Sequence, residues 1–212
     1  MPKTILFDLD GTLTDSGEGI INCATLALET LGMPVPSREE MRIFVGPPLH
    51  DTFVKFGVPK DQVEEAVKIF RGRYFTVGKY ENFPYPGIPE LLQKLKDAGH
   101  TLYVATSKPE TLALDVTSHF DLAKYFDLIC GATLDNSRVN KEDVITYLLD
   151  LSGGAENAVM VGDTEFDVLG AKAHGIPTIG VTWGYGTEES MVNAGAAHIV
   201  HTPEALFSAL NK

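Results

Sequence analysis

The sequence predicts an α/β fold on the strength of two observations. Through most of its 212 residues, short apolar runs alternate with segments of helical spacing, which is the pattern of a parallel sheet covered by helices. Between about Ser16 and Lys79 the alternation stops and only helical patterns remain. We therefore expect a Rossmann-like parallel sheet core, residues 1–15 and 80–212, with a helical cap, residues 16–79, inserted after the first strand.

Local patterns predict the individual elements of this core. The expected strands are short apolar runs: Thr4–Phe7, Thr101–Ala105, Asp127–Cys130, Ala158–Val161 and Thr178–Val181. The expected helices between them are Ile88–Ala98, Lys141–Leu151 and Glu165–Ala173. In the first of these helices Leu91 and Leu95 recur at helical spacing, and Gly99 follows as a C-terminal stop.

Composition and charge exclude several classes of partner. The formal net charge of -12 argues against binding to nucleic-acid backbones or anionic membranes. No apolar run approaches the ~18 residues that span a bilayer, and no secretory leader pattern precedes the first strand. Cys23 and Cys130, far apart in apolar patterns, are expected to be reduced core thiols of a cytoplasmic protein. The histidines lack the spacing of zinc ligands.

Two carboxylates stand directly after the first predicted strand. Asp8 and Asp10 follow the apolar run that ends at Phe7, and Gly11 and Thr12 come next. In an extended segment, residues two apart point to the same side, so the two carboxylates are expected to converge. Converging carboxylates repel unless a cation lies between them or they share a proton. Folding does not require such a pair, and we interpret it as part of a chemical site.

Hydroxyl groups follow the second core strand. Thr106 and Ser107 come after Ala105, and Lys108 and Pro109 are expected to begin the next helix. Taken alone, Thr106 is by default interpreted as a hydroxyl that satisfies backbone groups at a strand end. Together with free N–H groups at a helix start, the hydroxyls of Thr106 and Ser107 would form an anion site.

Further carboxylates are expected at the same edge of the sheet. Asp163 ends another core strand, and Asp167 falls in the first turn of the following helix. A helix N-cap would explain Asp163 alone, but not its convergence with Asp8 and Asp10 at the carboxyl ends of parallel strands. Oxygen-rich carboxylate sites suit Mg²⁺. We therefore predict a magnesium site that includes these four residues.

Lys141 occupies an unusual position for a lysine. It falls in the first turn of a predicted helix, where the macrodipole disfavours a cation, next to Glu142 and Asp143, which suit that position. The alternatives are a solvated surface lysine or a fixed positive charge directed at a phosphate group. Lys108 and Arg138 are as compatible with solvated surface charges as with phosphate contacts.

These residues resemble the motifs of the haloacid dehalogenase-type superfamily of phosphotransferases, over essentially the whole chain. The first motif is similar to residues 8–12, the second to Thr106, the third to Lys141 and the fourth to residues 162–167. The resemblance also implies a helical cap after the first strand. Because the dehalogenase branch lacks the second acid, the presence of Asp10 favours phosphoryl chemistry.

The resemblance implies roles for the carboxylates. Asp8 would attack phosphorus and form an aspartyl-phosphate, and Asp10 would protonate the leaving alcohol and then activate water. Mg²⁺ would be held by the Asp8 carboxylate, the Asp163 carboxylate and the backbone carbonyl of Asp10. Asp167 would either bind the ion directly or contact the groups that bind it. Thr106 and Lys141 would bind the transferring phosphoryl oxygens.

The predicted activity is hydrolysis of a small phosphorylated metabolite. Residues 44–49, 106–109 and 183–186 resemble the phosphoglycolate phosphatase-like group, and residues 137–145 resemble its 5'-nucleotidase-like branch more than the branch with Lys-Pro at the third motif. One alternative is a phosphomutase of the β-phosphoglucomutase type, although the segment after Thr12 lacks the histidine pattern of that branch. The other alternative is a non-enzymatic receiver-like module. The oligomeric state is left open.

Overall fold

The computed structural model describes residues 1–135, 137–154 and 156–211, and the chain divides into two compact units. Unit 1 consists of Met1–Thr14 and Pro84–Lys212, and unit 2 of Asp15–Phe83. The boundaries expected from the sequence, 15/16 and 79/80, lie close to these in the chain. Among the described residues, no helix is both long and apolar enough to cross a membrane.

Unit 1 is built on a six-stranded sheet whose order is β5-β4-β1-β6-β7-β8. All neighbouring strands in it are parallel. The strands are β1 (Thr4–Phe7), β4 (Thr101–Pro109), β5 (Leu128–Ala132), β6 (Ala158–Gly162), β7 (Thr178–Val181) and β8 (His198–Val200). β1 lies inside the sheet, and the chain adds β4 and β5 on one side of it and β6, β7 and β8 on the other. The sheet is therefore doubly wound, as expected for the predicted Rossmann-like core.

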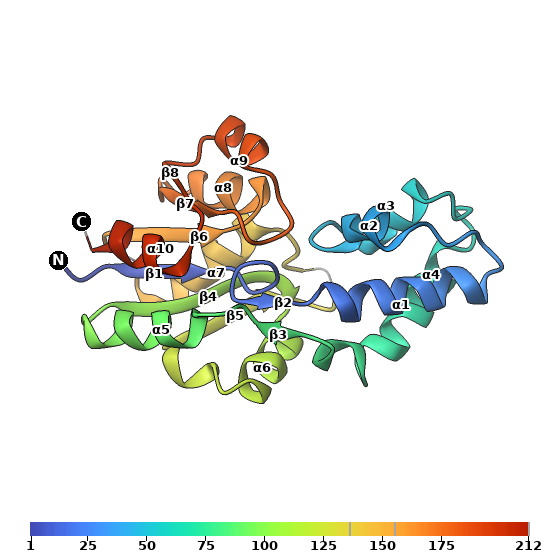
Figure 1. Cartoon of the computed structure of the whole chain (residues 1–212), viewed down its shortest axis with the longest axis horizontal. Coiled ribbons are helices and arrows are strands. Elements are labelled where there is room, and N and C mark those ends of the chain that lie inside the picture. The colour runs from blue at the N-terminus through green and yellow to red at the C-terminus, as the bar shows by residue number, and fades with distance from the viewer. Residues whose placement is uncertain (136, 155, 212) are drawn as a thin grey trace. The chain divides into compact units, whose positions relative to one another are not determined.

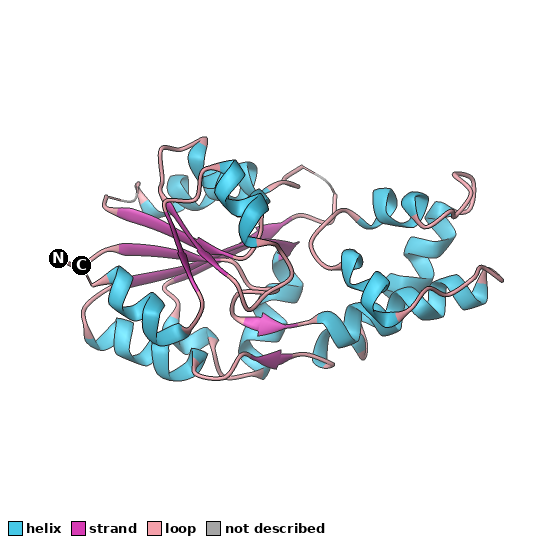
Figure 2. Ribbon diagram, turned by 45° about the horizontal axis from the view of Figure 1, so that its top comes forward, coloured by secondary structure: helices cyan, strands magenta, loops and turns pink. Residues whose placement is uncertain are grey.

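Helices cover both faces of this sheet (Figure 2). One face carries α5 (Ile88–Asp97), α6 (Glu110–His119) and α10 (Pro203–Leu210), and the other α7 (Lys141–Ser152) and α8 (Glu165–Lys172). Two shorter elements complete the unit, η3 (Ala123–Tyr125) and α9 (Glu188–Ala194). In β1, Ile5 and Phe7 belong to the first core and Leu6 to the second, all fully buried, which explains the unbroken apolar run.

Unit 2 is helical (Figure 1). It contains α1 (Gly17–Thr30), α2 (Arg38–Met41), η1 (Arg42–Phe44), α3 (Leu49–Lys55), α4 (Val63–Tyr74) and η2 (Gly78–Tyr80). Its core includes an aromatic cluster in which the Phe53 ring lies 5.0 Å from Phe44 and 6.5 Å from Phe70, both edge-on. Two short strands, β2 (Thr14–Asp15) and β3 (Phe83–Pro84), pair where the chain passes between the units.

The two cysteines are free and buried, as expected for core thiols. Cys23 belongs to unit 2 and Cys130 to unit 1. Burial raises the pKa of the Cys130 thiol to about 11, so this thiol is unreactive at neutral pH.

Candidate active site

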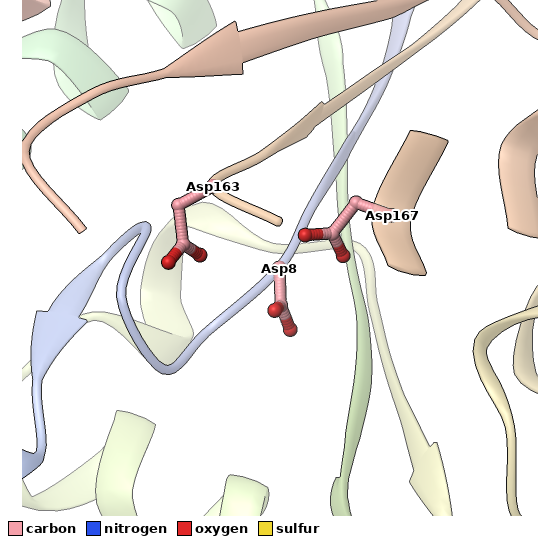
Figure 3. A group of neighbouring side chains, drawn as sticks. All are labelled: Asp8, Asp163 and Asp167. Atoms are coloured by element: carbon pink, nitrogen blue, oxygen red, sulfur yellow. The ribbon is translucent and has the colours of Figure 1, made fainter. Parts of the chain in front are cut away.

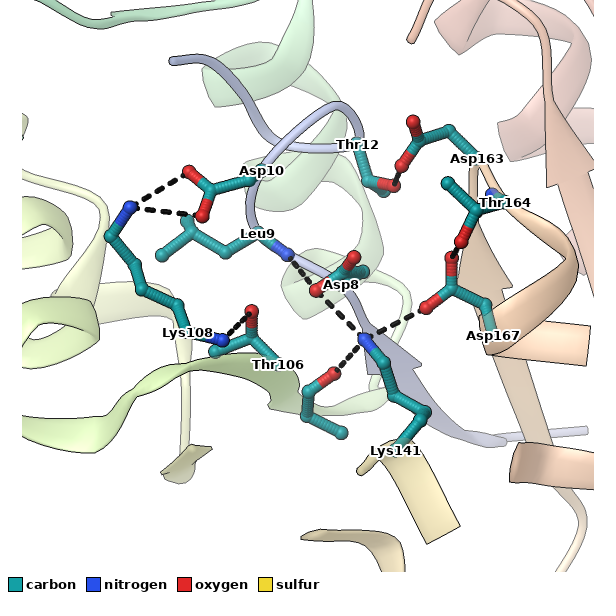
Figure 4. A network of polar contacts seen from close by, with 11 residues as sticks. Asp8, Leu9, Asp10, Thr12, Thr106, Lys108, Lys141, Asp163, Thr164 and Asp167 are labelled. Carbon is teal, nitrogen blue, oxygen red and sulfur yellow. Dashed lines mark hydrogen bonds and ion pairs between the residues drawn. The ribbon is translucent and has the colours of Figure 1, made fainter. Parts of the chain in front are cut away.

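The parallel sheet brings three of the predicted polar residues to one edge. Phe7 of β1 pairs with Val104 of β4 and Val161 of β6, so the residues that follow these strands are neighbours. The Asp8 amide continues this pairing with a hydrogen bond of 2.9 Å to the Val161 carbonyl. Asp8, Thr106 and the residues after β6 therefore meet at the carboxyl edge, where doubly wound sheets bind ligands (Figure 4).

Three carboxylates gather at this edge (Figure 3). Asp8, Asp163 and Asp167 each offer an oxygen, and these atoms lie within 4.8 Å of one another. Asp163 and Asp167 are fully buried and Asp8 is 9% exposed. Buried carboxylates at such short range repel strongly, so the cluster needs positive charge beside it.

Lys141 supplies part of that charge. Its Nζ lies 2.8 Å from Asp8 Oδ1 and 2.7 Å from Asp167 Oδ1, and it donates to the Ala105 carbonyl at 2.8 Å. Three acceptors match the three protons of an ammonium group. The lysine is 4% exposed, so the alternative of a solvated surface lysine is wrong. Asn140, the N-cap of α7, fixes the start of the helix by accepting from the Asp143 amide.

The start of α8 orients Asp167. Asp167 Oδ2 accepts from the Thr164 amide at 3.1 Å and from its hydroxyl at 3.0 Å, which leaves Oδ1 directed at Lys141. A side chain at Gly162 would overlap this carboxylate, because a Cβ there would lie 2.2 Å from Asp167 Cγ. Glycine at the end of β6 therefore lets the carboxylate pack against the backbone.

Asp163 is held by groups from two other loops. The Thr12 hydroxyl donates to Asp163 Oδ1 at 2.9 Å, and the Tyr185 amide donates to Oδ2 at 2.9 Å. The Trp183 indole donates to the Thr12 carbonyl at 3.0 Å and so ties the two loops together. Thr12, Trp183 and Tyr185 are site residues that the sequence patterns do not single out, although they lie in the motif-like segments 8–12 and 183–186.

Burial shifts the pKa values of the cluster. Burial raises the pKa of Asp8 to about 6, although the neighbouring Lys141 opposes the rise. Burial and the charges of Asp167 and Asp8 raise the pKa of Asp163 to about 8. Burial lowers the pKa of Lys141, but the two carboxylates beside it outweigh that effect and hold its pKa above the usual range. Lys141 is therefore charged, and the carboxylates are short of cationic partners.

The Asp10 carboxylate has a lysine of its own. Lys108 Nζ lies 3.0 Å from Asp10 Oδ1 and 2.9 Å from Oδ2. β1 ends at Phe7, so the alternation that predicted convergence of Asp8 and Asp10 does not extend to Asp10. The carboxylates that gather with Asp8 come instead from the second half of the chain. Lys108 is buried, which corrects its interpretation as a solvated charge.

The segment after Ala105 also differs from expectation. β4 continues to Pro109 and α6 begins only at Glu110, so Lys108 and Pro109 do not start a helix. Thr106 is buried in this strand and its hydroxyl accepts from the Lys108 amide at 3.2 Å. Ser107 is exposed. The hydroxyls therefore lie at the end of an extended strand and not at a helix N-terminus.

Arg138 is engaged by protein groups. It donates to Glu110 Oε2 at 2.8 Å and to the Gly131 carbonyl at 2.7 Å, and its guanidinium lies 3.7 Å from the Tyr147 ring centre. These contacts give Arg138 a structural role in the loop before α7, and they replace the phosphate contact that was one of its two interpretations.

The donor set fits a divalent cation bound by oxygen. Asp8, Asp163 and Asp167 lie close together beside Lys141, so among the described residues these three carboxylates share the charge of that lysine. Hard cations such as Mg²⁺ take carboxylate oxygens, whereas zinc and softer metals prefer nitrogen and sulfur. A metal ion at this cluster would neutralise the charge that burial leaves uncompensated.

Comparisons with known proteins agree with this fold. The model of the haloacid dehalogenase-like hydrolase family matches residues 5–181. A 5'-nucleotidase of Pseudomonas aeruginosa is 45% identical over 189 residues, covering 88% of this chain and 86% of the relative. A phosphoglycolate phosphatase of Caulobacter vibrioides is 32% identical over 206 residues, covering 94% and 86%.

Two further proteins are similar to this chain over most of its length. The tyrosine-protein kinase PtkA of Mycobacterium tuberculosis is 41% identical over 201 residues, covering 94% of this chain and 69% of the relative. A predicted phosphatase of Clostridium acetobutylicum has a crystal structure that superposes with a TM-score of 0.92 at 40% identity, covering 100% of this chain and 99% of that one. The chain belongs to the haloacid dehalogenase-like hydrolase family. Its relatives place it among the phosphatases of that family.

Proposed function

We propose that this protein is a Mg²⁺-dependent phosphatase that hydrolyses small phosphomonoesters through an aspartyl-phosphate on Asp8. The observation that carries the proposal is the arrangement of Asp8 beside Lys141 and two further carboxylates, next to the buried hydroxyl of Thr106. An anionic nucleophile can approach an anionic phosphate group only where fixed positive charge neutralises both.

Asp8 and Asp10 carry the two chemical steps. In the first, an Asp8 oxygen forms a bond to phosphorus, the bond from phosphorus to the ester oxygen breaks, and Asp10 gives a proton to the leaving alkoxide. In the second, the Asp10 carboxylate takes a proton from water as that water attacks phosphorus. The bond from phosphorus to Asp8 then breaks, so inorganic phosphate leaves and Asp8 and Asp10 return to their starting states.

Other residues bind the group that is transferred. Lys141 and the Thr106 hydroxyl stabilise the phosphoryl oxygens, and Ser107 contributes at the exposed edge of the same strand. Mg²⁺ would be held by Asp8, Asp163, Asp167 and the Asp10 backbone carbonyl, and it would supply charge neutralisation for the phosphoryl group. The contacts of Lys141 to Asp8 and Asp167 hold its positive charge beside the nucleophile before substrate arrives.

Substrate selection is assigned to the helical unit. We take residues 16–79 as a cap that selects among small metabolites, and residues 1–15 and 80–212 as the catalytic core of a cytoplasmic enzyme. The named relatives point to nucleoside monophosphates and phosphoglycolate as the substrates to try first. The negative net charge makes a nucleic acid or an anionic membrane a poor partner.

The central experiment measures phosphate released from 4-nitrophenyl phosphate in the presence of Mg²⁺. Asp8→Asn should abolish release while the protein stays folded, and Asp150→Asn, an exposed carboxylate on α7, should leave it unchanged. Retained activity in Asp8→Asn would refute the assignment of the nucleophile. Wild-type protein should also form an acid-stable, alkali-labile phosphoprotein in a rapid quench, and Asp8→Asn should not.

A second measurement separates hydrolysis from transfer to other acceptors. We expect release of free phosphate to account for all substrate consumed, in a screen of nucleoside monophosphates, phosphoglycolate and sugar phosphates. Isomerised sugar phosphate without free phosphate would favour a mutase. Phosphotyrosine formed from ATP would favour the activity named for the mycobacterial relative.

A further inference from the structure

We infer that Lys108 is a positioning residue for Asp10, holding its carboxylate where it can exchange a proton with the leaving group. The inference rests on the proposed function, because it assigns a task to Lys108 only if Asp10 is the acid and base. It goes beyond that function because Lys108 itself touches neither phosphate nor metal in the scheme above.

The contact between the two side chains has a specific geometry. Lys108 Nζ is within hydrogen-bond distance of both carboxylate oxygens, at 3.0 and 2.9 Å (Figure 4). The lysine side chain is 3% exposed and that of Asp10 is 17% exposed. A contact to both oxygens restricts rotation of the carboxylate plane, which a contact to one oxygen does not.

An irregularity in β4 directs Lys108 to this place. β4 advances from Thr106 to Pro109 while its partner β5 advances only from Gly131 to Ala132, so Ser107 and Lys108 form a bulge. Bulges of this kind change the direction of a side chain and are frequent beside active sites. The Lys108 amide is fixed in the bulge by its hydrogen bond to the Thr106 hydroxyl.

Neighbouring residues preserve the bulge. A Cβ on Gly131 would lie 2.5 Å from the Lys108 carbonyl oxygen and 2.7 Å from the Glu110 backbone, so the bulged strand can approach β5 only because residue 131 is glycine. The Gly131 amide donates to Glu110 Oε2 at 3.2 Å, and Arg138 binds the same carboxylate. The position of Lys108 is therefore built into the fold of unit 1.

This geometry matters for proton transfer. When one Asp10 oxygen carries the proton for the leaving group, it gives up its contact with Lys108, while the other oxygen keeps its contact and holds the carboxyl group in place. Without Lys108, Asp10 can turn into solvent through its exposed side. A misoriented acid slows the expulsion of poor leaving groups most, because good leaving groups depart without a proton.

The test compares esters of similar shape and different leaving group: phenyl, 4-nitrophenyl and 2,4-dinitrophenyl phosphate. For Lys108→Met, kcat/KM for phenyl phosphate should fall at least about 10-fold more than kcat/KM for the dinitrophenyl ester. Lys108→Arg, which can also bind both oxygens, should recover most of that selective loss. Lys124→Met, the same change at an exposed lysine, should show no loss.

A background variant shows whether Lys108 acts through Asp10. In Asp10→Asn protein, adding Lys108→Met should cause no further selective loss with phenyl phosphate. Equal loss for all three esters, or a selective loss that persists in the Asp10→Asn background, would overturn the inference. If Lys108→Met does not fold, as judged by circular dichroism, Lys108→Gln against Lys108→Arg provides the same comparison.

Failure of the proposed function gives a different result. In that case wild-type protein releases no phosphate from any of the three esters, or Asp8→Asn keeps its activity, and the assignment to Lys108 is overturned with it. If wild type is active, Asp8→Asn is inactive and Lys108→Met loses activity equally on all esters, the inference alone is wrong.

Discussion

The Thr12 hydroxyl donates a hydrogen bond of 2.9 Å to Asp163 Oδ1, across 151 residues of sequence. The Tyr185 amide holds the other oxygen of the same carboxylate at 2.9 Å. The orientation of Asp163 is thus set by the loop after β1 and the loop after β7, and not by β6, the strand that it follows. Partners of this kind fix the direction of a metal-binding carboxylate.

Removal of the Thr12 hydroxyl should weaken metal binding. Thr12→Val keeps the shape of the side chain but leaves Asp163 Oδ1 without this donor. We expect the Mg²⁺ concentration for half-maximal phosphatase activity to rise about 10-fold, in line with the loss of other partners of metal ligands. The measurement is a Mg²⁺ titration of activity. A parallel titration of thermal stability should show the same shift.

A matched threonine provides the control for this change. Thr146 lies on α7, and its hydroxyl donates to the Glu142 carbonyl at an exposed position. Thr146→Val should leave the Mg²⁺ midpoint unchanged. An unchanged midpoint in Thr12→Val as well would mean that Tyr185 and the backbone are enough to hold Asp163.

The core of the fold could be predicted because its strands are buried on both faces. β1, β4, β6 and β7 begin where their apolar runs begin, and helical spacing located α5, α7 and α8. β8 was missed because it is a three-residue strand at the edge of the sheet, with His198 exposed. The two-residue strands β2 and β3 are too short to leave a periodic signal.

The carboxylate cluster could be predicted from topology, but its supporting contacts could not. Strand ends in a parallel sheet meet at one edge, so Asp8 and Asp163 were expected to be neighbours. The partnership of Lys108 with Asp10 depends on a bulge, and that of Thr12 with Asp163 on two loop conformations. Neither leaves a periodic pattern in the sequence, because hydrophobic spacing reports burial and not loop geometry.

Loss of the Lys141 charge should reduce both activity and stability. Lys141→Met removes an ammonium group that contacts Asp8 and Asp167 at 2.8 and 2.7 Å. We expect kcat for 4-nitrophenyl phosphate to fall by about 10²–10³-fold, as for loss of other preorganised charges at reacting oxygens. Without metal, the free energy of unfolding should fall by about 3 kcal/mol, because buried carboxylates lose their partner.

Two controls separate these effects. Lys172→Met, at an exposed lysine on α8, should change neither quantity. Saturating Mg²⁺ should restore part of the lost stability of Lys141→Met, because a cation at the carboxylates replaces some of the missing charge, but it should not restore kcat. Full activity of Lys141→Met with Mg²⁺ would contradict a role in phosphate binding.

Stability of the metal-free protein should fall as pH rises from about 4 to about 8. The folded protein raises the pKa of Asp163 from 3.8 to about 8, so in this window the folded state binds a proton that the unfolded state has released. The free energy of unfolding then decreases with pH, by at most about 1.4 kcal/mol per pH unit for one proton. Asp8, with its pKa raised to about 6, acts in the same direction at lower pH.

Urea unfolding in the presence of a chelator, between pH 4.5 and pH 8, measures this dependence. Asp163→Asn should flatten it, because the amide does not titrate. Mg²⁺ should stabilise the wild type more at pH 8 than at pH 5, since metal binding requires ionised carboxylates. A metal-free stability that rises across this range would show that other groups dominate its pH dependence.

Alanine at Gly170 should destabilise the protein although it favours helix. Gly170 lies within α8, and a Cβ there would lie 2.7 Å from Cβ and Cγ of Lys141, too close for any real contact. Helix propensity gains at most about 1 kcal/mol from glycine to alanine, whereas overpacking costs about 1–3 kcal/mol. Because the displaced atoms carry the Lys141 ammonium, kcat should fall as well.

The same substitution at Gly72 measures the effect of helix propensity on stability without the overpacking expected at Gly170. Gly72 lies in α4, is exposed, and a Cβ there would have no neighbour within 4 Å. Gly72→Ala should therefore stabilise unit 2 by up to about 1 kcal/mol and leave kcat unchanged. If Gly170→Ala also stabilises the protein and keeps full kcat, then Lys141 can shift without loss, and its fixed position is not required for catalysis. We expect Gly170→Ala to lower the stability and Gly72→Ala to raise it, because the stem of Lys141 passes directly over the Gly170 backbone.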